Sequence, residues 1–290
     1  MGEAVFRSFE VIRRLGLAAK GNSLARRIVV PFSRARAGLR GGGLVYVQTL
    51  SILDPILREL GHTPRASLPD YVAEVRSNEP LRETFVMESE RRGFPKDKSW
   101  TDRVDRLTAN IVLYYALVRE LRPAIVVETG TATGSMTSLL LAALHANQHG
   151  RLISIDLPAV TGMLTMDIDV PESDVGYWIP PRYKDRWDYR KGDAKLLLPR
   201  VLAEERADFF VHDSLHTRSH MAFEYGVARA LMPEKAIIMS DDILWNDGFD
   251  AFASLHRLIA YAPLGNPNIG ILVNRFDKFE RATGLGIVPA

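Results

Sequence analysis

A short apolar run, a glycine-containing loop and a second apolar run follow one another near the middle of the chain. Residues 124–127 read Ala-Ile-Val-Val, residues 128–134 read Glu-Thr-Gly-Thr-Ala-Thr-Gly, and residues 138–144 read Ser-Leu-Leu-Leu-Ala-Ala-Leu. A short β-branched run is typical of a strand that is covered on both faces. Glycine lets the loop adopt backbone conformations that are closed to other residues. The pattern therefore predicts a buried strand, a tight turn and a helix.

The same alternation continues toward the C-terminus. Residues 151–156, 208–213 and 236–241 are predicted strands, and residues 217–231 and 249–262 are predicted helices. Strands that alternate with helices predict a doubly wound parallel α/β sheet. The apolar runs 269–273 and 284–288 flank a charged stretch that is too short for a crossover helix. These two runs therefore predict a terminal antiparallel hairpin.

The N-terminal part of the chain has a different character. Residues 1–40 carry nine Lys or Arg residues against Glu3 and Glu10. We expect a basic arm that docks on the body or on a second subunit, with a transit peptide or a membrane-surface helix as alternatives. Glycines at 41–43 predict a flexible break, and residues 44–95 predict helices punctuated by proline. Residues 1–100 are thus an expected lid or oligomerisation region, and residues 101–290 an expected second domain.

Composition excludes several classes of protein. The chain has 290 residues, no cysteine and a formal net charge of +2. Disulfides, thiolate zinc sites and a cysteine nucleophile are therefore excluded. The small net charge does not indicate a nucleic-acid partner, and none is expected. No apolar stretch is long enough to be a predicted transmembrane segment, and we expect a cytoplasmic protein.

The loop after the first predicted strand suits a small positively charged ligand. Its spacing is Gly-x-x-x-Gly, which leaves the dinucleotide fingerprint incomplete. Glu128 would repel a phosphate and would attract an ammonium group. Asp156 ends the next strand, where an acid can accept hydrogen bonds from both hydroxyls of a ribose.

These residues resemble the cofactor motifs of class I S-adenosylmethionine-dependent methyltransferases. Residues 128–134 with Asp156 resemble the first two motifs, and Gly192-Asp193-Ala194 resembles the third, in which the Asp neighbours the adenine. The resemblance covers residues 100–275 and implies a Rossmann-like sheet of seven strands. It implies that S-adenosyl-L-methionine is bound by Glu128, Gly130, Thr131, Gly134, Asp156 and Asp193. We expect Gly130→Val to obstruct the methionine moiety while leaving the fold intact.

A second group of acids follows the later strands. Asp213 ends one predicted strand, and Asp241 with Asp242 ends another. If these strands are neighbours they lie about 4.8 Å apart, and their carboxylates crowd one edge of the sheet. Such a cluster is costly unless it is protonated or bridged by a cation such as Mg²⁺. His216, three residues after Asp213, lies on the same side if the turn is helical, and a histidine suits a general base.

Residues 211–217 and 240–243 are similar to metal-dependent O-methyltransferases, closest to the branch that methylates sugars in macrolide and related antibiotic pathways. The resemblance implies an enzyme in which Asp213, Asp241 and Asp242 hold a divalent metal, expected to be Mg²⁺. It implies that His216 and Asp213 are the catalytic residues. Catechol-type relatives have Asp-Asn where this chain has Asp241-Asp242, so a catechol acceptor is disfavoured. The implied partner is a small-molecule methyl acceptor, and we expect a homo-oligomer.

Other interpretations remain open for single residues. Asp193 can be a turn residue, Glu128 can pair with an arginine, and Asp242 can cap the next helix. His216 can equally be a surface or capping residue. We expect His212 to face away from the acids, because successive strand residues point to opposite faces, and His220 to lie on a helix surface.

Three other functions are compatible with the sequence. A methyltransferase without a metal would methylate nitrogen or carbon, and its carboxylates would hold an amine. An NAD-dependent oxidoreductase is built on a similar sheet. A non-enzymatic RNA-associated module would use the basic arm.

Overall fold

A single mixed sheet of eight strands organises the chain. The computed structural model describes residues 42–93, 111–157, 170–264 and 267–276. The strands lie in the order β1-β7-β8-β6-β5-β2-β3-β4. All neighbouring pairs are parallel except those of β8, which is antiparallel to β6 and β7. In chain order the strands are β1 Gly43–Val47, β2 Ile125–Thr129, β3 Arg151–Asp156, β4 Trp187–Lys191, β5 Phe209–His212, β6 Ile237–Ser240, β7 Ile259–Pro263 and β8 Gly270–Val273.

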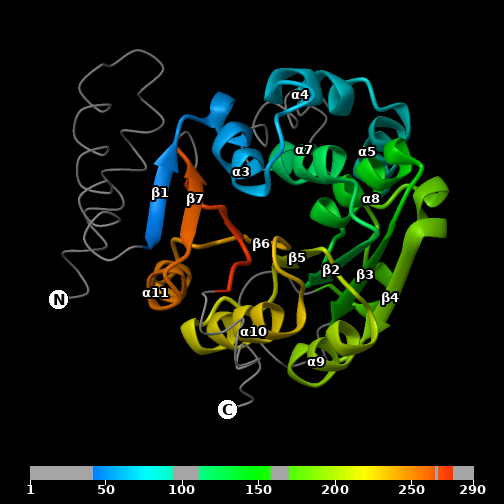
Figure 1. Cartoon of the computed structure of the whole chain (residues 1–290). Coiled ribbons are helices and arrows are strands. Elements are labelled where there is room, and N and C mark those ends of the chain that lie inside the picture. Colours follow the sequence, from blue (N-terminus) through cyan, green and yellow to red (C-terminus); the bar gives the residue numbers. More distant parts are fainter. Residues whose placement is uncertain (1–41, 94–110, 158–169, 265–266, 277–290) are drawn as a thin grey trace, which may run out of the picture.

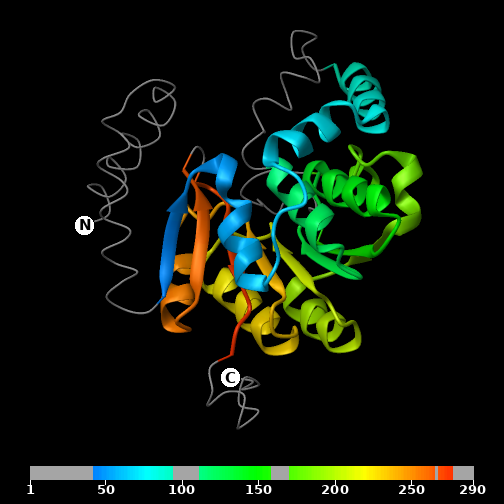
Figure 2. The same cartoon turned by 45° about the horizontal axis from the view of Figure 1, so that its top comes forward.

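Helices cover both faces of the sheet (Figure 1). One layer holds α3 Leu53–Leu60, α4 Leu68–Arg76, α5 Glu79–Arg91, α7 Ile111–Leu121 and α8 Ser135–Asn147. The other layer holds α9 Ala194–Glu204, α10 Arg218–Leu231 and α11 Gly248–Leu255. Short 3-10 helices span Thr49–Ser51, Glu172–Asp174 and Pro181–Arg186. Figure 2 shows α4 and α5 on the outer side of the first layer. No helix in the described ranges is long and apolar enough to cross a membrane.

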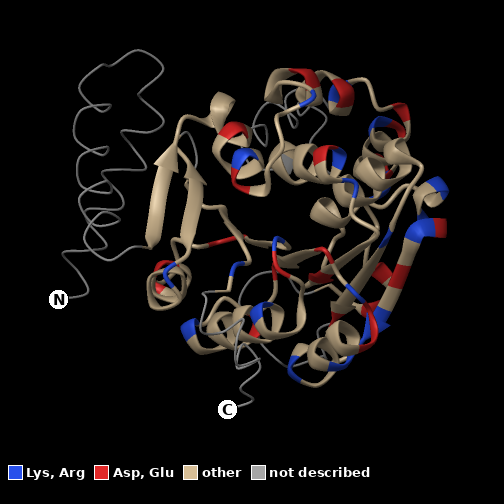
Figure 3. Ribbon diagram, viewed as in Figure 1, with Lys and Arg blue, Asp and Glu red and all other residues tan. Residues whose placement is uncertain are grey.

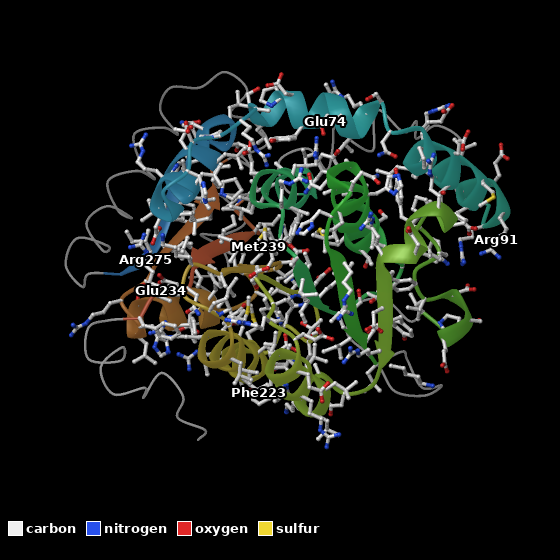
Figure 4. All side chains as sticks on the ribbon, turned by 45° about the vertical axis from the view of Figure 1, so that its right-hand side comes forward. Glu74, Arg91, Phe223, Glu234, Met239 and Arg275 are labelled. Atoms are coloured by element: carbon white, nitrogen blue, oxygen red, sulfur yellow. The ribbon has the colours of Figure 1, made fainter. Side chains whose placement is uncertain are left out.

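Successive residues of the central strands enter two separate cores. Val211 of β5 and Met239 of β6 belong to the core that contains α7 and α8. Phe210 and Ile238 belong to the core that contains α10. Figure 4 shows Met239 between Glu74 of the first layer and Phe223 of the second. The strand alternation therefore decides which helix layer each side chain meets, including the side chains at the strand ends.

The parallel α/β class is confirmed, and so are the predicted strands at 151–156, 208–213 and 236–241 within one or two residues. Among the described residues the sheet has eight strands, one more than the seven that the resemblance implied. The eighth is β1, where the sequence predicted a flexible break followed by helix. Gly43 of β1 pairs with Ile259 of β7. The segment becomes a strand because the free edge of β7 accepts it, which is a non-local contact.

The predicted helix at 249–262 is too long. Helix α11 ends at Leu255, Arg257 has a left-handed φ of 55°, and the following residues form β7. Strand β7 is the antiparallel hairpin partner of β8. The run 284–288, which the sequence assigned to that place, lies outside the described residues. Arg257 in its left-handed conformation reverses the chain after α11, and the apolar residues that follow then join the sheet as β7.

The region before residue 100 contains the predicted helices. Helix α4 begins at a capping box in which Ser67 and Asp70 exchange hydrogen bonds. The basic arm of residues 1–40 lies outside the described residues. The division of the chain at residue 100, and the role of the first part as a lid or an oligomerisation segment, stay predictions.

Strand β8 passes so close to α11 that glycine is required at its start. A Cβ atom on Gly270 would lie 2.2 Å from the ring of Phe249. We expect Gly270→Ala to lower the free energy of unfolding by about 1–3 kcal/mol, the usual cost of overpacking a core. The matched control is Gly226→Ala in α10, where a Cβ atom meets nothing within 4 Å. The control should gain roughly 0.5–1 kcal/mol from helix propensity. Urea unfolding of both variants measures the difference, and an equal effect would contradict the packing argument.

Candidate active site

Most of the predicted site residues lie at the carboxyl edge of the central strands. In the sheet register Thr129 pairs with His212 and His212 pairs with Ser240, so Gly130, Asp213 and Asp241 follow at neighbouring positions. The Asp213 N–H donates to the Thr129 carbonyl at 2.9 Å, and the Asp241 N–H donates to the His212 carbonyl at 2.9 Å. Figure 3 shows acidic segments where these strands end, between the two helix layers. This edge is where open α/β sheets bind ligands.

Gly130 is required by the neighbouring strand. Its φ is +85°, and a Cβ atom would lie 2.0 Å from the carbonyl oxygen of Asp213. The expectation that Gly130→Val leaves the fold intact is therefore wrong, because the side chain would collide with the backbone after β5. Gly134, at φ +81°, begins α8, and a Cβ atom there would lie 2.7 Å from the Cα atom of Gly176. Both glycines allow close backbone contacts that fix the shape of the loop.

Glu128 is fully buried at the end of β2. Its Oε2 atom accepts hydrogen bonds from the Thr137 hydroxyl at 2.9 Å and the Ser154 hydroxyl at 2.7 Å. Its Oε1 atom and the buried Thr131 hydroxyl have no partner among the described residues. Burial raises the pKa of Glu128 to about 8. The arginine pair considered for Glu128 is not among its contacts, and one carboxylate oxygen is left for a donor.

Asp156 and Asp193 both have partners from the protein. One oxygen of Asp156 accepts a hydrogen bond from the Ala132 N–H at 3.0 Å, and burial raises the pKa of this carboxyl group. Asp193 is the N-cap of α9 and accepts a hydrogen bond from the Lys195 N–H at 2.8 Å. Asp156 therefore also stabilises the glycine loop. The alternative considered for Asp193 was a turn residue; the structure makes it a helix cap, and its place beside an adenine stays a prediction.

The segment between β3 and β4 touches the glycine loop directly. The Gly176 N–H donates to the Ala132 carbonyl at 2.9 Å, and the Trp178 N–H donates to the Thr133 carbonyl at 3.0 Å. Trp178 stacks on Phe85 of α5, with ring centroids 5.2 Å apart. Sequence reasoning assigned no role to this insert. The structure makes it a bridge from the N-terminal helices to the loop.

Three acids lie at the ends of β5 and β6. Burial and the charges of Asp241 and Glu128 raise the pKa of Asp213 well above its usual range. Burial and the charge of Asp242 raise the pKa of Asp241 to about 6. Asp242 has a left-handed φ of 49° and accepts a hydrogen bond from the side-chain amide of Asn268. The acids repel one another, but among the described residues no three His, Asp or Glu side chains converge closely enough to hold a metal ion.

His216 lies between two of these acids. Its Nε2 atom is 3.9 Å from Asp213 Oδ1, and its Nδ1 atom is 4.0 Å from Asp242 Oδ2. The side chain is only 5% exposed, and neither ring nitrogen has a hydrogen-bond partner in the described part of the chain. Burial, together with His212, lowers the pKa of His216 to about 4. The ring is therefore neutral near pH 7 and free to accept a proton. The exposed Trp245 ring lies beside it, with centroids 5.5 Å apart.

A buried polar network supports the turn that carries Asp213 and His216. Glu224 of α10 accepts hydrogen bonds from His212 Nδ1 at 2.6 Å and His220 Nε2 at 2.8 Å. It also accepts from the hydroxyls of Thr129 at 2.6 Å and Ser214 at 3.0 Å. Although burial would raise the pKa of Glu224, the two histidines lower it to about 2.

Of the two predictions made for His212 and His220, one agrees with the structure and the other does not. His212 faces α10, as predicted. The assignment of His220 to the helix surface is wrong, because His220 is buried against Glu224. The spacing of His220 and Glu224, four residues apart in a helix, was the available signal.

Comparison with known protein families gives one match. Residues 127–243 match the model of a family described as a methyltransferase domain. The match runs from β2 to just beyond β6 and contains every site residue described above from Glu128 to Asp242. Residues 127–243 are therefore similar to a methyltransferase domain, and the match covers less than half of the chain. No curated protein sequence matches the chain.

Several solved structures share the general fold. An O-methyltransferase from Bacillus cereus, solved in complex with SAH, is 17% identical, with a TM-score of 0.47 over 71% of this chain and 96% of that chain. TomG from Streptomyces achromogenes, an O-methyltransferase involved in tomaymycin synthesis, is 15% identical, with a TM-score of 0.47 over 70% and 92%. The TDP-rhamnose 3'-O-methyltransferase of calicheamicin biosynthesis is 16% identical, with a TM-score of 0.45 over 71% and 92%.

Glu128 should make the stability of the ligand-free protein depend on pH. A carboxyl group whose pKa is raised on folding contributes stability below its unfolded pKa, and this contribution is lost as pH rises through the folded value of about 8. Glu128→Gln should therefore unfold at a higher temperature than the wild type at pH 8, by the equivalent of roughly 2–4 kcal/mol, and the difference should close at pH 5. The same variant should bind S-adenosylhomocysteine more weakly. Thermal unfolding at both pH values and calorimetric titration measure these effects, and a pH-independent difference would refute the buried-acid argument.

Proposed function

We propose that the chain is an O-methyltransferase that transfers the methyl group of S-adenosylmethionine to a hydroxyl of a small molecule, assisted by a divalent metal. The observation that carries the proposal is His216. A nearly buried, neutral imidazole with both nitrogens unpaired stands between two carboxylates at the ligand edge of the sheet. Such a group accepts a proton from a bound hydroxyl.

The cofactor fits the residues that end β2 and β3. The free Glu128 oxygen and the free Thr131 hydroxyl are buried hydrogen-bonding atoms without partners in the described residues. A buried polar atom without a partner is costly, so each favours a ligand that satisfies it. Glu128 would accept from the ammonium group of the methionine moiety, and Asp156 from the ribose. When bound, the cofactor supplies an electrophilic methyl group.

The metal part of the proposal rests on the donor atoms after β5 and β6, although no three of the described acids and histidines converge on one point. Asp213, Asp241 and Asp242 offer oxygen atoms, which are the ligands that Mg²⁺ prefers. The raised pKa values of Asp213 and Asp241 reflect burial and mutual repulsion, and a cation would relieve the repulsion. When bound, the metal would lower the pKa of an acceptor hydroxyl.

A metal would make an acceptor hydroxyl a better proton donor to His216. An imidazole whose pKa is about 4 is present in the basic form at neutral pH, but it is a weak base. It can take a proton efficiently only from a hydroxyl that has already become acidic. The metal-free rival, in which the carboxylates hold an amine and nitrogen or carbon is methylated, needs no such hydroxyl.

The acceptor would lie outside the acids, next to Trp245 and Leu215. Both side chains are exposed although they are apolar, and Trp245 neighbours His216. An exposed aromatic ring can stack on a planar or sugar-like acceptor while the acids address its hydroxyl. We propose a sugar or another natural-product intermediate as the acceptor and a homo-oligomer as the assembly.

Removal of the metal and of the base tests this function. Formation of S-adenosylhomocysteine is measured with a panel of hydroxylated sugars and phenols. We expect EDTA to abolish turnover and Mg²⁺ or Mn²⁺ to restore it. His216→Ala should lower kcat by about 10²–10⁴, the usual range for a general base, with cofactor affinity unchanged. The matched control is His149→Ala, an exposed residue after α8, which should keep full activity.

Each part of the proposal can fail separately. Full turnover in excess EDTA would rule out the metal and favour the metal-free rival. A silent His216→Ala would leave the metal in place and remove the base from this residue.

A further inference from the structure

A chain of hydrogen bonds links the last strand of the sheet to Glu128. The indole Nε1–H of Trp187 in β4 donates to the Ser154 hydroxyl in β3 at 2.9 Å. The Ser154 hydroxyl donates to Glu128 Oε2 at 2.7 Å, and the Thr137 hydroxyl of α8 donates to the same oxygen at 2.9 Å. Ser154, Thr137 and Glu128 are fully buried. The other oxygen of Glu128, Oε1, has no partner among the described residues.

The chemistry of these groups fixes the direction of the chain. An indole N–H can only donate, so the Ser154 oxygen must accept from Trp187. The single hydroxyl proton of Ser154 is then directed to Glu128. Because Oε2 receives two donated hydrogen bonds, the carboxylate cannot rotate without breaking both. Oε1 is therefore the oxygen that is left for a ligand. Without the indole, the Ser154 hydroxyl would be free to turn away from Glu128.

Packing alone does not require these polar groups. In β3, Ser154 is the one polar residue between Leu152 and Ile155, and all four residues of this stretch are buried. A buried hydroxyl needs hydrogen-bond partners, and Ser154 finds them in Trp187 and Glu128. An aromatic ring without a nitrogen would pack against the same core, but only the indole supplies the donor.

The Trp187 ring also contacts the segment that touches the glycine loop. A Cβ atom on Gly176 would lie 2.9 Å from the Cη2 atom of Trp187, so the backbone at this glycine lies close against the ring. The Gly176 N–H donates to the Ala132 carbonyl of the loop at 2.9 Å. The ring is partly buried against the core that contains α7 and α8. Trp187 is therefore held beside the loop while its nitrogen directs Ser154.

We propose that Trp187 is a positioning residue for the cofactor, because through Ser154 it holds the Glu128 side chain with Oε1 open to the ammonium group of the methionine moiety. The inference rests on the cofactor proposed above and is independent of the metal. A carboxylate that is oriented before the ligand arrives lowers the ordering cost of binding. The contribution of Trp187 to affinity is therefore limited to ligands that carry the ammonium group.

The test compares two ligands that differ in the group that Glu128 would bind. S-adenosylhomocysteine carries the ammonium group, whereas methylthioadenosine has the same adenosine and sulfur without the amino-acid end. Trp187→Phe should weaken S-adenosylhomocysteine binding about 3- to 10-fold, the equivalent of one hydrogen bond between neutral groups. Ser154→Ala should weaken it about 10- to 100-fold, because the lost bond is made to a charged group. The Kd for methylthioadenosine, also measured by calorimetric titration, should not change in either variant.

A double variant tests whether Trp187 acts through Ser154. Trp187→Phe in the Ser154→Ala background should cause no further loss of affinity, because the link is already broken. The matched control is Tyr115→Phe, which removes the hydrogen bond of another buried aromatic side chain, made to Glu74 Oε2 at 2.8 Å. The control should lower the Tm and leave both Kd values unchanged.

The outcomes separate this inference from the function on which it rests. If the wild type binds S-adenosylhomocysteine and Trp187→Phe binds it equally well, the inference is overturned and the cofactor stands. Equal weakening of both ligands, or an undiminished effect in the Ser154→Ala background, would reduce Trp187 to a packing residue and also overturn it. Should Trp187→Phe fail to fold, Ser154→Ala decides, and an unchanged ratio of its two Kd values overturns the inference. If the wild type binds neither ligand, the cofactor part of the proposed function fails and the inference falls with it.

Discussion

The contact between the ends of β2 and β5 is the constraint on which the site depends. Gly130 passes so close to the Asp213 carbonyl that no side chain fits between them. This contact joins the glycine loop to the turn that carries Asp213 and His216, so the cofactor motif and the acid cluster form one unit. Strand alternation also sends His212 toward α10, where it meets Glu224. The close contact between the backbones of Gly130 and Asp213 thus places the glycine loop and the acid-bearing turn at the same edge of the sheet.

Desolvation gives the groups at this edge unusual protonation states. Burial favours the neutral forms of Glu128, Asp213 and His216. It therefore raises the pKa of the two carboxyl groups and lowers the pKa of the imidazole. Glu224 behaves differently, because two histidines and two hydroxyls satisfy its charge. Toward α10 the charge of Glu224 is therefore satisfied, whereas Glu128 Oε1 has no partner among the described residues. A cationic cofactor is a ligand that such an acidic edge would accept.

Local patterns predicted the central part of this arrangement. The run 124–127, the glycine loop and the acids at strand ends are local signals, and their neighbourhood follows from the geometry of a parallel sheet. The strand β1 was missed because it forms only where β7 offers an edge. Glu224 and His220 were missed for a related reason. Each lies in a helix at an ordinary core position, and its importance arises from the buried polar network that it joins.

The two helix layers contribute differently to the site. Helix α10 makes it rigid, and reactive groups such as Glu128 lie toward α7 and α8. Glu224 ties β2, β5 and the turn at Ser214 to α10 through bonds that are already formed without any ligand. The turn that carries His216 is therefore held before a substrate arrives, which reduces the entropy lost on binding. Buried atoms without partners in the described residues occur on both sides: Glu128 Oε1 and the Tyr114 hydroxyl toward α7 and α8, and His212 Nε2 and His220 Nδ1 toward α10. Because Glu224 already fixes the backbone between them, these open groups are held in place at one edge of the sheet.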